Sequence, residues 1–467
     1  MSRSIVQLFN WKFKKVEGFL PQLSKLGFTH VKVSSPSLSV AQNEWWGRYQ
    51  PLHFFIIAGP LGYKDEFISM CHVAKELEIS IVVDCLMLRM ADPIYNYNEM
   101  IYGNETLLRK HPQWIYFSGQ YLSLPQNRQL ELKSEHFAIK EEQNANEQNA
   151  NEINRDVCYL DVTHPDIQRL QVEYLDFLVE LGVTSICIDV DKKNKTITPD
   201  YIGMITNKFL EKVADVSYLQ SLVLCDVPST LYEPIKKYVD CVLSHHNWKH
   251  VLFFNYPLLE KYKNMTNSRT SINSFIRQYK TDIPVLNALQ FGCNENTSYL
   301  NKYPRLRTSS IEADNLDILM SLVGHGTPYF FIDDHQSITL GDHEVKHYSI
   351  ETLENRKLDK ILRLYMNSTR LSPLKQLWGN HHFWIGYRTD KGRDVINKSY
   401  IVILNNNLFS YKIHPSWPDV GVFNSVPDGL YVDYLEGIFS LSIRNGILEN
   451  DIVFPPKTLV VFTPLEI

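Results

Sequence analysis

Hydrophobic and polar positions alternate between two periods along the first two thirds of the chain. Short apolar runs such as SIVQLFNW are typical of buried strands, whereas FKKVEGFLPQLSKLG spaces its apolar residues three and four apart, as an amphipathic helix does. Seven further segments repeat the strand pattern: FTHVKVSSP, ISIVVDCLML, SICIDVD, SLVLCDV, CVLSHH, TSSIEAD and TPYFFIDD. Strands that alternate with helices indicate right-handed βαβ units and a parallel sheet.

Eight such strands, interrupted by a long insert after the third, favour a closed barrel over an open sheet. The predicted fold class is therefore α/β: a (β/α)8 TIM barrel with an inserted domain and a C-terminal all-β domain. We place the barrel at residues 1–87 and 160–383, and the insert at 88–159. Short strands without helices predict a β-sandwich at 384–467. The insert contains QNANEQNANE, which we expect to be a flexible loop.

Composition and charge exclude several classes of protein. The 467 residues carry a net charge of -5, which gives no electrostatic case for binding nucleic acid or an anionic membrane. No apolar run reaches the roughly 18 residues that a membrane-spanning helix needs. The start of the chain, MSRSIVQLFNW, has no signal-peptide core, so we expect cytosolic synthesis, with signal-less export left open. The 7 cysteines have no CxxC or zinc-like spacing and are expected to be buried thiols.

Acidic residues stand at the ends of four predicted strands: Asp84, Asp189, Asp226 and Asp314. Active sites of TIM barrels lie at the C-terminal ends of the strands. Such carboxylates could supply the nucleophile, the proton donor and a positioning acid of a retaining glycosidase. The alternative is that each aspartate only caps the helix that follows its strand.

The segment NEWWGRYQP places Trp45, Trp46 and Tyr49 in a polar loop, next to Arg48 and Gln50. It has neither a helical nor a strand period, and its Asn, Gly and Pro mark a loop. The rings could form a small packed surface cluster. They could instead form a stacking platform for a flat ligand, with Arg48 and Gln50 as hydrogen-bonding neighbours.

These segments together resemble the α-amylase clan, glycoside hydrolase family 13, nearly from end to end. WWGRYQP is almost identical to the WWxRYQP of animal-type α-amylases, and PLGYKDEF, GTPYFF and PDGLYVDYLEG are similar to other family segments. The resemblance implies a barrel, an inserted domain B and a C-terminal β-domain. It also implies that Trp45, Trp46, Tyr49 and Gln50 line glucan-binding subsites beside the bond that is cut.

The fourth and fifth strands depart from the family's catalytic motifs. The strand-four motif, approximately G-F-R-I-D-A-x-K-H, reads SICIDVDKK. Asp189 matches the nucleophile, but Cys187 replaces the arginine that orients it and Lys193 replaces the histidine. The strand-five general acid, a glutamate in the family, is Asp226, which is one methylene shorter. A displacement on the order of 1 Å can lower a rate about 100-fold.

The remaining motifs are also incomplete. In SSIEAD, which resembles the strand-seven motif F-V-x-N-H-D, Asp314 is kept and Ala313 replaces the histidine. In strand three, D-V-V-x-N-H becomes DCLMLR. Asp84 and Arg89 therefore stand at substrate-binding positions, whereas Leu88 replaces an asparagine that binds calcium in the family.

A second calcium ligand of the family, in the segment L-P-D-L-N, is matched by Tyr159 in CYLDV. Because a hard cation needs several oxygen ligands, the resemblance predicts no calcium site, and no other cofactor is indicated. Three functions stay open. The favoured one is an amylase-like protein of carbohydrate metabolism or recognition that binds α-glucan or maltooligosaccharide with little or no hydrolysis. The others are an active retaining hydrolase or transglycosylase that uses Asp189 and Asp226, and a non-catalytic protein-interaction scaffold with an unidentified partner.

Overall fold

The computed structural model describes most of the barrel and of the C-terminal domain, and only the edges of the insert. The described residues are 3–39, 48–91, 115–117, 120–121, 157–190, 194, 196–214, 221–245, 247–266, 271, 283–284, 287–291, 326–333, 360, 364, 375–388, 399–415 and 422–465. QNANEQNANE, Trp45, Trp46, Lys193, Ala313 and Asp314 lie outside them.

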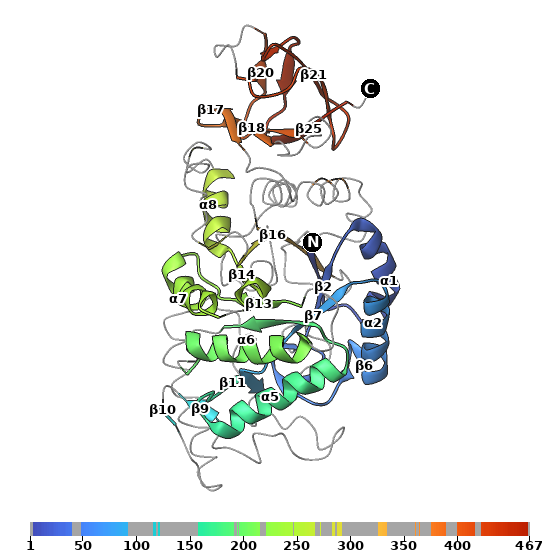
Figure 1. Cartoon of the computed structure of the whole chain (residues 1–467), viewed down its shortest axis with the longest axis vertical. Coiled ribbons are helices and arrows are strands. Elements are labelled where there is room, and N and C mark those ends of the chain that lie inside the picture. The colour runs from blue at the N-terminus through green and yellow to red at the C-terminus, as the bar shows by residue number, and fades with distance from the viewer. Residues whose placement is uncertain are drawn as a thin grey trace.

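Eight parallel strands form a closed barrel, in the order β1, β16, β15, β14, β13, β12, β7, β2 (Figure 1). They span Ile5–Phe9 (β1), His30–Val33 (β2), Ser80–Asp84 (β7), Ser185–Asp189 (β12), Val223–Asp226 (β13), Val251–Phe254 (β14), Ala288–Phe291 (β15) and Thr327–Asp333 (β16). The predicted (β/α)8 barrel is confirmed. Each strand runs through a hydrophobic interior, as expected of a parallel sheet that is buried on both faces.

The described helices cover the outside of the barrel. They span Phe13–Leu26 (α1), Lys64–Glu76 (α2), Pro165–Glu180 (α5), Pro199–Ala214 (α6), Tyr232–Leu243 (α7) and Tyr256–Thr266 (α8), with a short 3-10 turn at Trp248–His250 (η4). The predicted first helix ends as expected at Gly27, whose φ of 93° lets its N–H reach the carbonyls of Leu23 and Ser24. At the start of α5 the side chain of His164 accepts a hydrogen bond from the backbone N–H of Asp166.

One of the predicted strands was wrong. CVLSHH begins inside α7, where Val239 and Val242 are the buried face of a helix, and the sixth strand is β14. The seventh strand is β15, and TSSIEAD with Asp314 lies outside the described residues. The reason is that a short apolar run reads alike in a buried strand and in the buried turn of a helix.

The insert begins directly after β7. Its described strands form an antiparallel sheet in the order β10, β9, β11, β8. They span Arg89–Ala91 (β8), Ile115–Phe117 (β9), Gln120–Tyr121 (β10) and Val157–Leu160 (β11). Two small hairpins stand before α2, formed by Leu38–Ser39 (β3) with Pro51–His53 (β4), and by Ala58–Gly59 (β5) with Gly62–Tyr63 (β6).

The C-terminal part is all β, as predicted. A seven-stranded sheet has the order β17, β18, β19, β25, β21, β22, β23, and β20 pairs with β24. The strands span Lys375–Gly379 (β17), Phe383–Arg388 (β18), Tyr400–Asn405 (β19), Tyr411–Ile413 (β20), Gly429–Asp433 (β21), Ser440–Arg444 (β22), Ile447–Leu448 (β23), Ile452–Phe454 (β24) and Thr458–Pro464 (β25). The sheet thus starts at Lys375, ahead of the boundary expected at 384.

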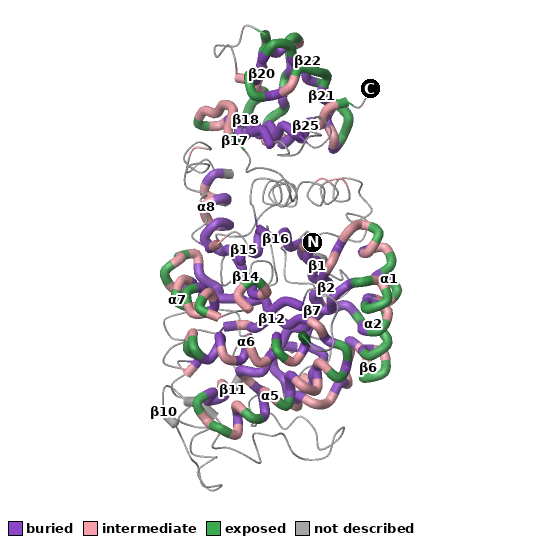
Figure 2. The backbone as a smooth tube through the Cα atoms, in the orientation of Figure 1, coloured by how far each residue is buried: buried purple, intermediate pink, exposed green. Residues whose placement is uncertain are grey.

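The barrel strands are buried (Figure 2), and the alternation of their side chains divides the core into two clusters. On β1, Val6 and Leu8 join the cluster under the helices, whereas Ile5 and Phe9 join the cluster inside the barrel. The interior cluster continues through α8 into the C-terminal domain, where it includes Trp384. No helix in the described part of the chain is long and apolar enough to cross a membrane.

Candidate functional site

Three of the sequence-predicted carboxylates lie at one edge of the barrel. Asp189 and Asp226 are register partners at the ends of β12 and β13. Asp84 ends β7 and is the register partner of Cys187 on β12. Parallel strands present their C-terminal ends on the same side, so the fold gathers these residues from segments far apart in the sequence.

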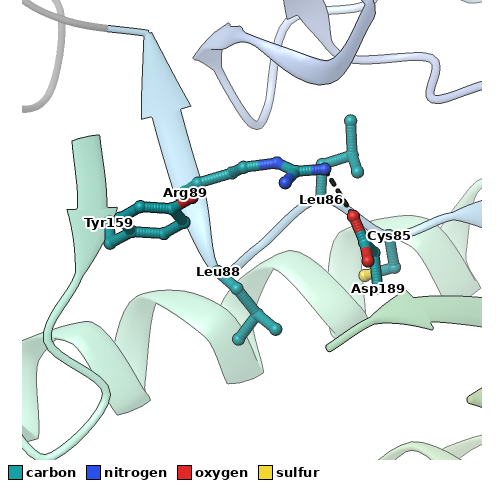
Figure 3. Close-up of a pocket in the computed structure, with 6 residues that line it drawn as sticks. All are labelled: Cys85, Leu86, Leu88, Arg89, Tyr159 and Asp189. Atoms are coloured by element: carbon teal, nitrogen blue, oxygen red, sulfur yellow. Dashed lines mark hydrogen bonds and ion pairs between the residues drawn. The ribbon is translucent and has the colours of Figure 1, made fainter. Parts of the chain in front are cut away.

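Asp189 is held by an arginine from the insert. Nη2 of Arg89 donates a hydrogen bond to Oδ2 of Asp189 over 2.6 Å (Figure 3). Their side chains are only 12% and 24% exposed. A short, charge-assisted contact of this kind is stronger than a neutral hydrogen bond. Cys187 stands where the resemblance predicts an arginine, and Arg89 places a guanidinium beside Asp189 instead. The sequence predicts a substrate contact for Arg89.

Asp226 lies in a different environment. It is only 2% exposed, and its Oδ1 accepts a hydrogen bond of 2.9 Å from the hydroxyl of Tyr256. Tyr256 is the first residue of α8, is fully buried and packs against the rings of Phe254 and Phe291. The predicted general acid is therefore covered by an aromatic layer. Sequence reasoning missed Tyr256, because it follows β14, which was not recognised as a strand.

Asp84 forms an ion pair inside the barrel. Nζ of Lys32, on β2, lies 2.8 Å from its Oδ1, and the Lys32 side chain is fully buried. The Lys32 ammonium also lies 5.9 Å from the centre of the Phe254 ring. Because a buried charge requires a partner, Asp84 and Lys32 neutralise each other in this structure. The sequence signal was the lysine in the centre of the apolar strand HVKV.

Tyr49 belongs to the aromatic loop, the segment NEWWGRYQP at residues 43–51, and its ring lies near this edge of the barrel. Its ring stacks on Phe9 at a centroid distance of 6.4 Å, and the Arg89 guanidinium lies 5.7 Å from the Tyr49 centroid. Gln50 and Arg48 are 2% and 4% exposed. Burial lowers the pKa of Arg48 to about 10. These two side chains therefore face the protein interior, while Tyr49 stays partly exposed.

The Arg89–Asp189 pair lines a small pocket. Its lining residues are Cys85, Leu86, Leu88, Arg89, Tyr159 and Asp189 (Figure 3). Burial is the largest cause that raises the pKa of the Cys85 thiol, and the charge of Asp84 adds to it. The thiol therefore stays protonated and is a poor nucleophile or metal ligand.

The two positions expected to have lost calcium ligands also meet in this pocket. Tyr159 is the register partner of Arg89, and Leu88 points away from the ion pair in Figure 3. Among the described residues, no group of three His, Cys, Asp or Glu side chains is arranged to hold a metal ion. An aliphatic side chain cannot donate oxygen, so the donors present do not fit a calcium ion.

Sequence relatives of the chain are α-amylases and α-amylase-related proteins. No protein-family model matches the chain. It is 30% identical over 119 residues to an α-amylase of Aeromonas hydrophila, which is 25% of each chain. It is 27% identical over 215 residues to an α-amylase-related protein of Drosophila bakoue, which is 44% of this chain and 40% of that protein. The matches thus span less than half of these relatives.

Solved structures of α-amylases share the fold over nearly the whole length. The α-amylase of Geobacillus thermoleovorans, complexed with acarbose, aligns with a TM-score of 0.66 at 13% identity, covering 99% of this chain and 98% of that one. Wild-type α-amylase I of Eisenia fetida aligns with a TM-score of 0.66 at 12% identity, covering 100% and 98%. This chain is therefore an α-amylase-like protein with the α-amylase-family fold.

Proposed function

We propose that this protein binds α-glucan and hydrolyses it slowly or not at all. The observation that carries the proposal is the burial of Asp226 behind Tyr256. A general acid must approach the departing oxygen to within about 2.6–3.2 Å, directly or through one water. A carboxylate that is 2% exposed and hydrogen-bonded to a fully buried tyrosine does not offer its oxygens to a substrate.

The other two described carboxylates support the same proposal. Asp84 is paired with buried Lys32, and Asp189 with Arg89. A nucleophile must attack a sugar carbon from a position fixed relative to the acid, and in a retaining enzyme the two carboxyls are about 5–5.5 Å apart. Here Asp189 is partly exposed, whereas its neighbour Asp226 is enclosed. The two carboxylates therefore do not face the same glycosidic bond.

Glucan binding is proposed from the aromatic residues. Stacking a sugar on a ring depends on apolar area and on the ring face, not on acid–base groups, so binding can persist where catalysis is lost. Tyr49 lies beside Arg89 and is partly exposed, and Trp45 and Trp46 shortly precede it in the sequence. A mutant of α-amylase I from Eisenia fetida has been solved as a complex with maltohexaose. We extend that ligand class to this chain as part of the proposal.

One observation favours an active hydrolase or transglycosylase as the second candidate. The contact of 2.6 Å from Arg89 fixes the carboxylate of Asp189 in place, and a nucleophile needs such orientation. In that case Tyr256 must move away from Asp226 when substrate binds.

Two measurements on the purified full chain separate these candidates. We expect maltoheptaose to change the tryptophan fluorescence with a weak affinity, and reducing-sugar release from starch to stay orders of magnitude below that of an ordinary α-amylase. The Asp189→Asn variant is the control for any residual activity. Turnover of tens per second that this variant abolishes would establish the second candidate. Absence of binding at millimolar maltoheptaose would contradict the proposed ligand.

A further inference from the structure

Arg89 occupies a junction between three segments of the chain. It is the first residue of β8, the strand with which the insert begins. Its guanidinium contacts Asp189 at the end of β12 and lies over the ring of Tyr49, which belongs to the aromatic loop. No two of these residues are neighbours in the sequence, and each was a separate candidate for the site. Arg89 is the residue that brings them together.

The chemistry of arginine suits this junction. A guanidinium is planar, so its edge can donate to a carboxylate while its face packs on an aromatic ring. The Tyr49 ring is supported on Phe9, and the pair with Asp189 is largely screened from water. By contrast, the pair between Lys236 and Asp240 on α7 is 45% and 53% exposed, as is usual for a surface ion pair of little consequence.

The backbone of the insert fixes the origin of the Arg89 side chain. Arg89 is the register partner of Tyr159 on β11, and the backbone N–H of Leu160 donates to the carbonyl of Leu88 over 3.1 Å. The preceding Cys85 donates its N–H to the carbonyl of Cys187, which ties the same segment to β12. A change in the β8–β11 pairing is therefore transmitted to the guanidinium and then to Asp189.

We propose that Arg89 is a positioning residue through which the insert sets the place of both the Asp189 carboxylate and the Tyr49 ring. Arg89 need not touch the ligand itself. The inference deepens the proposed function, because it makes glucan affinity depend on the insert. Its geometric part, the hold on Asp189, does not depend on any ligand.

The geometric part is tested by carboxyl labelling with a carbodiimide and an amine, read by mass spectrometry on the full chain. In Arg89→Gln we expect labelling of Asp189 to rise about fivefold, and amide exchange in residues 157–160 to accelerate. Arg89→Lys keeps a cation and should leave the labelling near that of the parent. The matched control, Lys236→Gln, breaks the exposed pair and should change neither signal. Unchanged labelling in Arg89→Gln would overturn the proposal.

The functional part is tested by titrating the same variants with maltoheptaose. We expect Arg89→Gln to weaken binding about tenfold. Arg89→Lys should also weaken it, because an ammonium has no planar face for Tyr49. If Arg89→Lys kept both the labelling and the affinity of the parent, while Arg89→Gln changed both, Arg89 would be only a structural ion pair. That result would contradict the proposal. If the parent does not bind maltoheptaose, the proposed function fails, while the labelling result still decides the role of Arg89.

Discussion

The two halves of the barrel mouth differ in what covers them. On the side of β7 and β12, the Arg89–Asp189 pair lines a small pocket, and Asp189 keeps a quarter of its side chain exposed. On the side of β13 to β16, aromatic rings fill the space, among them Phe254, Phe291 and Tyr329 with Tyr256. The open half, at β7 and β12, thus keeps a partly exposed carboxylate beside a pocket, whereas the closed half, at β13 to β16, is packed with aromatic rings.

This difference explains how a barrel can keep strand-end carboxylates without keeping their chemistry. Asp189 and Asp226 are register partners, yet Asp189 lines the described pocket, whereas Asp226 is buried and bonded to Tyr256. The aromatic half is continuous with the interior cluster that reaches Trp384 through α8. Burial of that many rings stabilises the fold, and the same burial removes Asp226 from solvent.

Breaking the Lys32–Asp84 pair should have the largest effect, because the Lys32 side chain is fully buried and the Asp84 side chain is only 8% exposed. Lys32→Met leaves a buried carboxylate without its cation, and such a change costs about 3–5 kcal/mol of stability. Urea unfolding followed by circular dichroism measures it. The double variant Lys32→Met/Asp84→Leu removes both charges and should recover much of the loss. Equal destabilisation by the single and the double variant would show that the pair itself is unimportant.

Truncating the aromatic loop should affect binding and not folding. Trp46→Ala or Tyr49→Ala should lower the affinity for maltoheptaose by about 2 kcal/mol, which is about thirtyfold. Fluorescence titration gives the affinity and thermal unfolding confirms the fold. Tyr63→Ala, which alters a tyrosine that is 65% exposed, is the control. If binding ignores both loop substitutions, the loop serves only for packing.

Removing the hydroxyl of Tyr256 should destabilise the closed half. Tyr256→Phe keeps the ring and deletes a donor to a buried carboxylate, so we expect a loss of about 2 kcal/mol in urea unfolding. The comparable change in the open half, Arg89→Gln, should cost less, about 1 kcal/mol, because the Asp189 side chain is 24% exposed and water can hydrate its carboxylate once the arginine is gone. A larger loss in Arg89→Gln than in Tyr256→Phe would reverse the assignment of the two halves.

Chelation should have the smallest effect. Leu88 and Tyr159 stand where the family's calcium ligands are expected, so excess EDTA should leave the melting temperature unchanged. An ion present at 100 times its dissociation constant would add about 2.7 kcal/mol, which thermal unfolding detects easily. A drop of several degrees, restored by added calcium, would reveal a site built from other residues.

Local patterns along the chain were enough to predict three features: the alternation of strands and helices, the all-β character of the C-terminal part, and the positions of Asp84, Asp189 and Asp226 at strand ends. These features follow from periodicity, which is local and survives in the printed order of residues. Periodicity could not distinguish the sixth strand from the end of α7, because a short buried helical turn has the same apolar run.

The partners of these carboxylates, by contrast, depend on how distant segments pack in three dimensions. Lys32, Arg89 and Tyr256 come from β2, β8 and the start of α8, and nothing in their spacing from Asp84, Asp189 or Asp226 fixes which meets which. Ion pairs and hydrogen bonds act over a few ångströms, whereas these partners are tens of residues apart in the chain. Closure of the barrel and the path of the chain at the start of the insert bring these partners into contact. The same two features produce the difference between the open and the closed half.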